Sequence, residues 1–474
     1  MINHANPVRP RAGFATLWTF RASAALLGLF LIGTTTASAA IGDWQKGASV
    51  GSAWDGDFAT ESFRQSLRDM REAHANFVTL VIPYEQTNIH TTDIRKRGYA
   101  PTDEALASAI DFAHSIGLQV NLMPHLDPAD DTWRIYINPG NRDEWFKNYE
   151  DVVLLPLARM AQEHGVEMLT LGVELGAMTM ASSNGSNDWH WRETIKKVRN
   201  AYTGILTYSA QHDDPNEKAD IGWWDAVDYI GISAYHTSGL GWGSKSVEEL
   251  RDEWKRWYDS ALRPLVTRFG KPIIFPEIGF KSVPNAHVQP AAWWWGGGYD
   301  PQEQARNYEA VFQAFADNPD FKGIHWWGWK SDPNAGGEGN EDYTPQGKPA
   351  EEVMRRYFGM GEQAETPQEQ DSASSAASSD AVSSSSVSSV APETASGQEQ
   401  SSSSSEQPAA SSGSSVSSAA PQAASSSSQA SEMAVQTSLP SYLQRARQRA
   451  MLRQQRALAD MLKKLQLLQP FIRS

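Results

Sequence analysis

Two glutamates each close a short apolar run of the sequence. Glu174 follows the run 169–173, and Glu277 follows the run 273–276. About a hundred residues separate them, which is room for several strand–helix units. Cleavage of a glycosidic bond needs two carboxyl groups that face one sugar, and a barrel of parallel strands brings the ends of distant strands onto one face. The pair therefore predicts glycoside chemistry. The alternative is a structural role, in which the carboxylates cap helices or pair with arginines.

Polar and aromatic residues follow other strand-like runs. His125 and Asp127 follow the third run, Tyr235 follows the sixth, and Trp327 and Trp329 end the eighth. Neutral polar groups can hold sugar hydroxyls, and flat rings can stack on sugar faces. We expect these five residues to bind substrate at the same rim as the two glutamates.

Other chemistries lack their motifs. No second histidine stands at ligand spacing from His125, so no catalytic metal is expected. The chain has neither a Gly-x-Ser-x-Gly elbow nor a phosphate-binding loop, which argues against an esterase and a kinase. We expect no cofactor, no nucleic-acid partner and a monomer.

The elements that must position these residues alternate between strand and helix from residue 40 to 360. This alternation predicts a (β/α)8 barrel. A doubly wound open sheet is the alternative, but no glycine-rich turn follows the first strand. The short apolar runs that predict strands are 47–50, 76–83, 118–124, 168–173, 204–209, 227–233, 272–276 and 323–329. The intervening segments that predict helices are 61–75, 103–115, 144–164, 189–202, 247–269 and 301–317.

Aromatic residues are abundant, with eighteen tryptophans and fourteen tyrosines. The clusters Trp293–Trp295 and Trp326–Trp327 are hard to bury completely. They favour a carbohydrate cleft over a role confined to the core.

The N-terminus, residues 1–39, predicts an export signal. Arg9, Arg11 and Arg21 precede or open a stretch of apolar and small residues, and Ala37-Ser38-Ala39 is a small-residue cleavage site. The alternative is an uncleaved membrane anchor, although the apolar run is short for a span. Since the chain has no cysteine, neither disulfides nor lipid attachment are expected. We expect a periplasmic or secreted protein, with association to the cell surface as a further option.

Two segments follow the predicted barrel. Residues 361–438 are rich in serine and alanine, which predicts a disordered linker. Residues 439–474 carry eight basic residues against one acidic residue, a net charge of +7. Apolar residues recur there at helical spacing, so we expect a basic amphipathic helix that binds an anionic membrane or envelope surface. The alternative is a helix that packs on nothing.

Several motifs together resemble glycoside hydrolase family 113, whose members are chiefly β-1,4-mannanases in the clan of retaining (β/α)8 enzymes. The resemblance spans about 47–358. Its motifs are Met123-Pro-His-Leu-Asp127, Trp145-Phe-Lys-Asn-Tyr149, Leu171-Gly-Val-Glu-Leu175, Val198-Arg-Asn-Ala-Tyr-Thr-Gly204 with Leu206-Thr-Tyr208, Asp228-Tyr-Ile-Gly-Ile-Ser-Ala-Tyr235, Pro276-Glu-Ile-Gly279, Trp326-Trp-Gly-Trp329 and Gly347-Lys-Pro-Ala-Glu351.

The resemblance implies a role for each carboxylate. Glu174 matches the family's acid/base and Glu277 its nucleophile, while Tyr235 matches a tyrosine beside the nucleophile. His125 and the pair Trp327 and Trp329 match substrate contacts. Many families of this clan place asparagine directly before the acid/base, where it contacts the sugar 2-hydroxyl, but this chain has Val173.

The expected function is a retaining endo-β-1,4-mannanase-like glycoside hydrolase acting on a polysaccharide or oligosaccharide. Val173 leaves the preference between mannose and glucose open, so glucan and xylan are alternative substrates. A non-catalytic barrel that binds carbohydrate or tethers the envelope is the alternative from another class.

Overall fold

The computed structural model describes residues 41–213, 216–294 and 296–360. The predicted export signal 1–39, linker 361–438 and basic helix 439–474 lie outside these ranges. Within them, no helix combines the length and apolarity needed to cross a bilayer.

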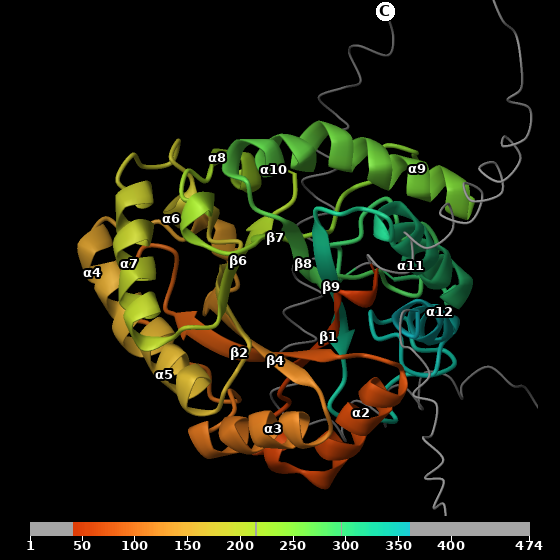
Figure 1. The fold of residues 1–474 in the computed structure, drawn as a ribbon, viewed down its shortest axis with the longest axis horizontal. Coiled ribbons are helices and arrows are strands. Elements are labelled where there is room, and N and C mark those ends of the chain that lie inside the picture. Colours follow the sequence, from red (N-terminus) through yellow and green to blue (C-terminus); the bar gives the residue numbers. More distant parts are fainter. Residues whose placement is uncertain (1–40, 214–215, 295, 361–474) are drawn as a thin grey trace, which may run out of the picture. The chain divides into compact units, whose positions relative to one another are not determined.

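Eight parallel strands close into a barrel, because β1 pairs with both β2 and β9 (Figure 1). The predicted (β/α)8 barrel is therefore confirmed. A two-residue strand, β3, pairs antiparallel with the end of β2 and was not predicted. The strands are β1 Gln45–Gly51, β2 Phe77–Gln86, β3 Arg95–Lys96, β4 Gln119–Pro128, β5 Met168–Val173, β6 Ile205–Gln211, β7 Ile230–Ser233, β8 Ile273–Ile278 and β9 Phe321–Trp329.

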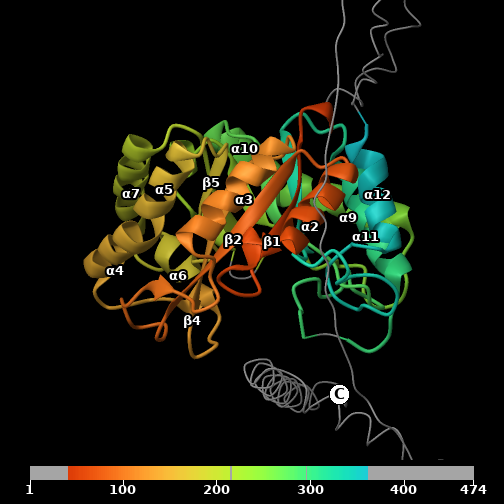
Figure 2. The same ribbon diagram turned by 90° about the horizontal axis from the view of Figure 1, so that it is seen from below.

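The helices surround the strands, as the view from the side also shows (Figure 2). Four-residue helices, α6 and α8, follow β5 and β6 at the edge where the glutamates lie. The helices are α2 Glu61–Glu72, α3 Asp103–Ser115, α4 Arg142–Tyr149, α5 Leu155–Glu163, α6 Gly176–Thr179, α7 Asn187–Ala201, α8 Glu217–Asp220, α9 Val247–Trp257, α10 Arg263–Phe269, α11 Pro301–Phe315 and α12 Pro349–Phe358.

Two segments predicted as single helices are interrupted by a wider π-helical turn, which is a correction to both predictions. The turns are Glu150–Leu154 and Tyr258–Leu262, and each is followed by a proline, Pro156 or Pro264. A proline inside a helix has no N–H to donate and crowds the carbonyl four residues earlier, so the backbone widens before it. The sequence analysis also missed α12, which a long loop separates from β9.

Side chains inside the barrel form layers, because alternate residues of a strand point to the same side. Phe77, Met168 and Ile274 form an apolar cluster near the start of the strands. Val81, Met123 and Val173 form a second cluster nearer their ends, with Trp327 packed against it.

A buried polar layer lies between the two apolar clusters. Asn121 donates to the Thr79 hydroxyl (3.0 Å), which is bonded in turn to His325 Nδ1. His325 Nε2 then lies 3.1 Å from the Gln45 amide oxygen. Burial lowers the pKa of His325 to about 3, so its ring is neutral. Since these buried groups have partners, the barrel is a packed support for the rim and not a pore.

Two tryptophans of β9 lie on the outer side of the barrel. Trp326 is buried and stacks on Tyr308 of α11 at 3.6 Å between ring centroids, so the expectation that it lines a cleft is wrong. Trp329 is 1 % exposed, and its indole donates to the Ser66 hydroxyl of α2 at 2.8 Å. The register of β9 against β1 shifts between Trp327 and Trp329. That one-residue shift turns Trp329 outward, whereas strict alternation would turn it inward.

Candidate active site

The two glutamates lie at the carboxyl edge of the barrel. Glu174 directly follows β5, and Glu277 is the penultimate residue of β8. Arg134, from the loop after β4, is close enough that the charges of both glutamates raise its pKa. The strand ends therefore bring the two carboxyl groups into one charged cluster, as predicted.

Glu277 receives a donor on one carboxylate oxygen and faces a histidine with the other. The Tyr235 hydroxyl donates to Oε1 at 2.8 Å, and His125 Nε2 lies 3.4 Å from Oε2. The Trp327 indole stacks on the His125 ring at 5.4 Å with an interplanar angle of 6°. All four side chains meet at the rim although they come from four strand ends.

Arg134 sets the tautomer of His125. Its Nη1 donates to His125 Nδ1 at 2.9 Å, and its Nε donates to Asp127 Oδ1 at 2.8 Å. Since Nδ1 accepts, the proton of a neutral His125 must sit on Nε2, which faces Glu277. Burial and the Arg134 charge lower the pKa of His125, against the pull of Glu277, so this ring is neutral near pH 7. Asp127 thus acts through Arg134 and His125 to present an N–H to Glu277.

The pKa of Glu277 is lowered by its partners. Burial alone would raise that pKa, but the approach of His125 Nε2 to Oε2, the charge of Arg134 and the hydrogen bond from Tyr235 outweigh it. Because His125 is neutral, its contribution comes from the Nε2–H dipole, 3.4 Å from Oε2, and not from a positive charge. Glu277 is therefore suited to stay ionised.

Glu174 has the opposite surroundings. Burial raises its pKa to about 8, and the negative charge of Glu277 adds to that rise. The Trp133 indole donates to Glu174 Oε2 at 3.3 Å. Glu174 is therefore suited to hold a proton near neutral pH.

The backbone of Glu174 is strained. Its φ is 52°, in the left-handed region, and its N–H donates to the Ser209 carbonyl at 2.9 Å. This conformation costs a non-glycine residue about 1 kcal/mol and persists where the surrounding structure fixes it. Strain at a candidate catalytic residue indicates that the side chain is held in place.

Six of the seven predicted residues gather at this rim: Glu174, Glu277, His125, Asp127, Tyr235 and Trp327. Trp329 does not, because its side chain is buried against α2 on the outer side of the barrel. The sequence analysis missed Trp133 and Arg134. Trp133 precedes, and Arg134 opens, a short 3-10 helix beyond the end of β4, and neither belongs to an apolar run. An adjacent aromatic and basic pair at this edge is nevertheless a usable signal.

Exposed aromatic rings surround the site. Apart from Trp189, which lies near the start of α7, every exposed tryptophan and tyrosine among the described residues lies in a segment that leads from a strand to the next helix, at the edge of the two glutamates. These residues are Trp54, Tyr99, Trp133, Tyr136, Trp189, Trp242, Trp293 and Trp294. Such rings match the flat faces of sugars. Trp293 and Trp294 are exposed, and the aromatic cleft stays a prediction.

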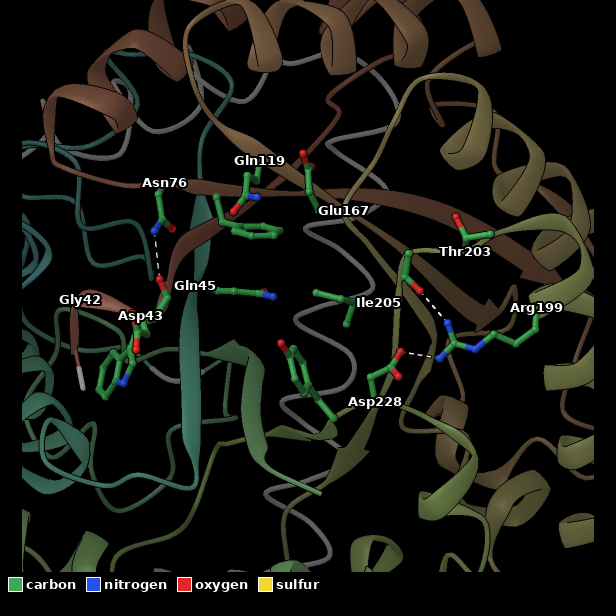
Figure 3. Close-up of a pocket in the computed structure, with 14 residues that line it drawn as sticks. Gly42, Asp43, Gln45, Asn76, Gln119, Glu167, Arg199, Thr203, Ile205 and Asp228 are labelled. Atoms are coloured by element: carbon green, nitrogen blue, oxygen red, sulfur yellow. Dashed lines mark hydrogen bonds and ion pairs between the residues drawn. The ribbon is translucent and has the colours of Figure 1, made fainter. Parts of the chain in front are cut away.

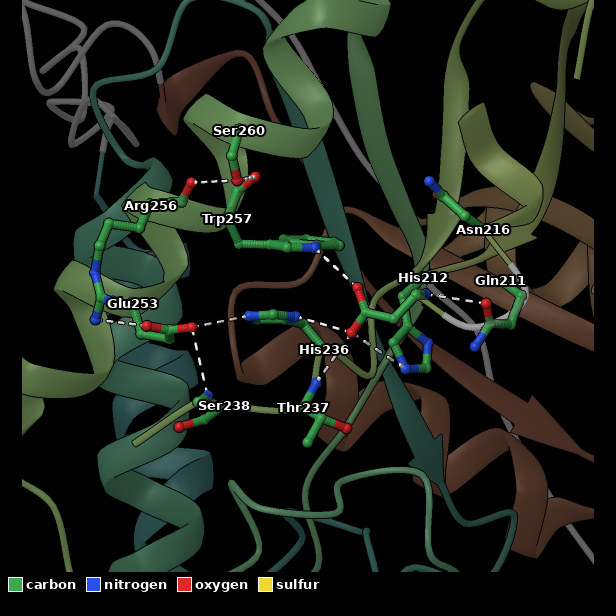
Figure 4. A network of polar contacts seen from close by, with 12 residues as sticks. Gln211, His212, Asn216, His236, Thr237, Ser238, Glu253, Arg256, Trp257 and Ser260 are labelled. Atoms are coloured by element: carbon green, nitrogen blue, oxygen red, sulfur yellow. Dashed lines mark hydrogen bonds and ion pairs between the residues drawn. The ribbon is translucent and has the colours of Figure 1, made fainter. Parts of the chain in front are cut away.

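A polar network fixes the loop that carries Tyr235 (Figure 4). The neighbouring His236 lies 3.0 Å from Asp213 and 3.3 Å from Glu253, and its ring stacks on Trp257 at 4.7 Å. The Trp257 indole donates to Asp213 at 3.1 Å. These contacts join the ends of β6 and β7 to α9 and hold Tyr235 against Glu277.

A cavity of about 530 Å³ lies at the opposite face, where the strands begin (Figure 3). Three of its charged side chains already have partners. Arg199 is paired with Asp228, and Glu167 accepts the Val120 N–H at 2.8 Å. Because that face of a barrel supports stability more than catalysis, we place the candidate site at the glutamate rim. Across the residues that the structure describes, no group of three or more metal-ligating side chains could hold an ion.

Comparisons with known proteins agree with this geometry. The family model described as Glycoside Hydrolase Family 113 matches residues 51–348, more than half of the chain. A solved GH113 β-1,4-mannanase is 29% identical, with a TM-score of 0.58, and covers 67% of this chain and 99% of its own. The GH113 β-mannanase from Alicyclobacillus acidocaldarius, solved in complex with ManMIm, is 30% identical with the same TM-score and covers 66% and 97%. No curated protein sequence matches the chain. The chain belongs to glycoside hydrolase family 113.

Proposed function

We propose that this glycoside hydrolase is a retaining β-1,4-mannanase in which Glu277 is the nucleophile and Glu174 the acid/base. The observation that carries the proposal is the opposite treatment of the two carboxyl groups. Glu277 is surrounded by groups that favour its anion, and Glu174 by groups that favour its protonated form. Two carboxyl groups with separated pKa values are what double displacement requires.

The first half of the reaction uses both states. Ionised Glu277 attacks the anomeric carbon, and protonated Glu174 gives its proton to the departing oxygen. Tyr235 and His125 hold the attacking carboxylate in place through its two oxygens. The expected separation of the carboxyl groups is about 5–5.5 Å, because no water has to fit between them.

The second half reverses the role of Glu174. Once Glu277 is bound to the sugar, its negative charge is lost, and the pKa of Glu174 falls. Glu174 can then accept a proton from the water that attacks the intermediate, which releases a sugar of retained configuration. The loss of the Glu277 charge thus changes Glu174 from a proton donor to a proton acceptor.

Mannan is the proposed substrate because the GH113 structures at 29–30% identity are β-mannanases. Val173 lies buried in the apolar layer beneath the site, so it offers no hydrogen bond to a sugar 2-hydroxyl. The preference for mannose must therefore be set by other side chains.

The leaving sugar is proposed to lie over Trp133 and Tyr136. The two rings are 41% and 54% exposed and meet edge to face at 5.8 Å. Trp133 also contacts Glu174, and the acid must point at the bond to the leaving sugar. Stacking there would place the oxygen that receives the proton beside Glu174.

Hydrolysis of three polysaccharides tests the function. Purified protein is incubated with β-mannan, xylan and cellulose, and new reducing ends are counted while NMR follows the first anomer formed. Mannan cleavage with a β-anomer first is the expected result. An α-anomer would overturn the retaining mechanism, and cleavage of xylan or cellulose alone would overturn the substrate. A protein that binds a glycan without cleaving it would favour the non-catalytic barrel.

Export is proposed from residues 1–39. Mass spectrometry of the mature protein should find an N-terminus at or near Ala40. A mature chain that still begins at Met1 would favour a membrane anchor.

Surface binding is proposed for residues 439–474 on the basis of their +7 charge. Removing residues 361–474 should leave mannan hydrolysis near normal and reduce retention on anionic vesicles at low salt, since salt screens such binding. Equal retention of the full chain and the truncated form would refute the proposal. Gel filtration of both forms tests the expected monomer.

A further inference from the structure

A third carboxylate, which the proposed mechanism does not use, lies behind Glu174. Glu217 opens α8 and is 0 % exposed. It accepts hydrogen bonds from the Gln211 N–H at 2.7 Å, the Tyr208 hydroxyl at 2.7 Å and the Thr179 hydroxyl at 2.5 Å. A buried carboxylate needs such donors, because water cannot reach it.

The pattern of donors is that of an ionised carboxylate. The backbone N–H of Gln211 can only donate. The Tyr208 oxygen already accepts the Leu175 N–H at 2.6 Å, so its own proton points to Glu217. Burial raises the pKa of Glu217 to about 7, and the three donors and the charge of Lys218 oppose that rise.

Glu217 holds both ends of the segment that follows Glu174. Tyr208 connects it to the backbone of Leu175, the next residue after Glu174, and Thr179 ends the short helix α6. Glu174 itself has the left-handed φ of 52° described above. The Glu217 carboxylate therefore fixes the backbone that directly follows Glu174, whose own backbone is strained.

The adjacent Lys218 acts on the charge of Glu217 but directs its ammonium to other groups. The Lys218 ammonium binds the His212 carbonyl and the Asn216 side chain (2.9 Å), and it lies 4.0 Å from Asp213. The groups that act on Glu174 are Glu277 and Glu217, which favour its protonated form, and Arg134 and Trp133, which favour its anion. Of the two carboxylates in this set, Glu217 is the one that does not attack the sugar in the proposed mechanism.

We propose that Glu217 is a positioning residue for Glu174: it fixes the segment 175–179 through Tyr208 and Thr179, and its negative charge helps to keep the proton on Glu174. This inference rests on the proposed role of Glu174 as the acid/base. Glu217 thus has two separable effects, one on the position of the segment 175–179 and one on the proton of Glu174. Different variants remove each effect.

Three variants separate charge from position. Glu217→Gln removes the charge and sets an amide N–H₂ against groups that donate. Tyr208→Phe keeps the Glu217 carboxyl group and its other two donors but removes the link to Leu175. Glu150→Gln is the matched control, because Glu150 is also a buried carboxylate with hydrogen-bonded partners, Thr194 and Lys197, and plays no part in the site.

The readout is the pH dependence of kcat/KM on mannan, with thermal melting as the measure of folding. The basic limb of that profile reports the loss of the Glu174 proton. Removing a nearby negative charge lowers the pKa of Glu174, so Glu217→Gln should move the basic limb to lower pH by about 0.5 unit or more. Tyr208→Phe should lower kcat by roughly tenfold with little movement of the limb. Glu150→Gln should leave both unchanged.

The outcomes distinguish this inference from the proposed function. A folded Glu217→Gln with a wild-type basic limb would overturn the charge effect, and wild-type kcat in Tyr208→Phe would overturn the positioning effect. If Glu217→Gln does not fold, Thr179→Val and Tyr208→Phe test the positioning effect. Thr179→Val keeps the Glu217 carboxyl group and the Tyr208 link. Wild-type kcat in both variants would refute the proposal that Glu217 fixes the segment 175–179. If the unmodified protein cleaves no glycan, or Glu174→Ala is as active as wild type, the proposed function fails instead.

Discussion

Glu277 and Glu174 carry the same side chain, and the structure gives them different neighbours. Glu277 faces Tyr235, just after β7, and His125 of β4, and the charge of Arg134 acts on it. Glu174 faces one indole N–H and the charges of two other carboxylates. The difference between an ionised and a protonated glutamate is therefore built by residues on other strands and not by the two glutamates.

The largest expected effect comes from removing the ionised partner. Glu277→Ala deletes the proposed nucleophile and should lower kcat by at least ~10⁴-fold, as loss of a nucleophile does in other enzymes. Activity is measured as reducing-end release from mannan, and circular dichroism checks the fold. Added azide should restore turnover and give a glycosyl azide of inverted configuration, because the small anion attacks in place of Glu277. An azide product of retained configuration would assign the nucleophile elsewhere.

Removing the protonated partner should give an effect that depends on the leaving group. Glu174→Ala deletes a proton donor, which typically contributes about 10²–10⁴-fold. The loss should appear with mannan, whose departing oxygen needs a proton. It should largely vanish from the first step with an aryl β-mannoside of low leaving-group pKa. Equal losses on both substrates would contradict the role of Glu174 as an acid.

Removing a hydrogen-bond donor from Glu277 should narrow the difference between the pKa values of the two glutamates. Tyr235→Phe deletes the 2.8 Å hydrogen bond to Oε1. Hydrogen bonds to charged groups contribute about 1.5–3 kcal/mol, so kcat/KM should fall roughly ten- to hundredfold. The bond lowers the pKa of Glu277, so its loss raises that pKa and the acid limb of the kcat/KM profile moves to higher pH. The basic limb of the same profile serves as the internal control. The two apparent pKa values of the profile belong to the coupled pair of glutamates.

Much of the fold could be predicted because parallel barrel strands are buried on both faces and appear as short apolar runs. The strand β5 has its predicted bounds, and the other barrel strands differ at their ends. The last residues of β2, which pair with β4, were missed because Glu85 and Gln86 are polar and do not continue the apolar run. The helices 144–164 and 247–269 were predicted as single because apolar spacing continues across the π-helical turns that precede Pro156 and Pro264.

The site residues that stand at strand ends could be predicted. The residues that come from loops, and the one whose orientation depends on a register shift, could not. Glu174, Glu277, His125 and Tyr235 stand at strand ends, so topology alone brings them together. Trp133, Arg134 and Glu217 come from loops or a short helix, whose path no periodicity describes. Trp329 was misplaced because a shift in the register of β9 turned it to the outer side of the barrel.

The smallest expected effect concerns the one hydrogen bond that favours the Glu174 anion. Trp133→Phe keeps an aromatic face and removes the indole N–H that lies 3.3 Å from Glu174. That bond lowers the pKa of Glu174, so its loss should raise this pKa and move the basic limb to slightly higher pH, opposite in sign to Glu217→Gln. Since stacking is kept, KM should change about twofold or less, whereas Trp133→Ala should raise KM by roughly three- to tenfold through loss of an aromatic contact worth about 0.5–1.5 kcal/mol. The pair is compared on mannan oligosaccharides at several pH values. If the basic limb moves to lower pH in Trp133→Phe, the indole shields Glu174 from water more than it stabilises the Glu174 anion. The difference between the pKa values of the two glutamates would then rest on burial and charge alone.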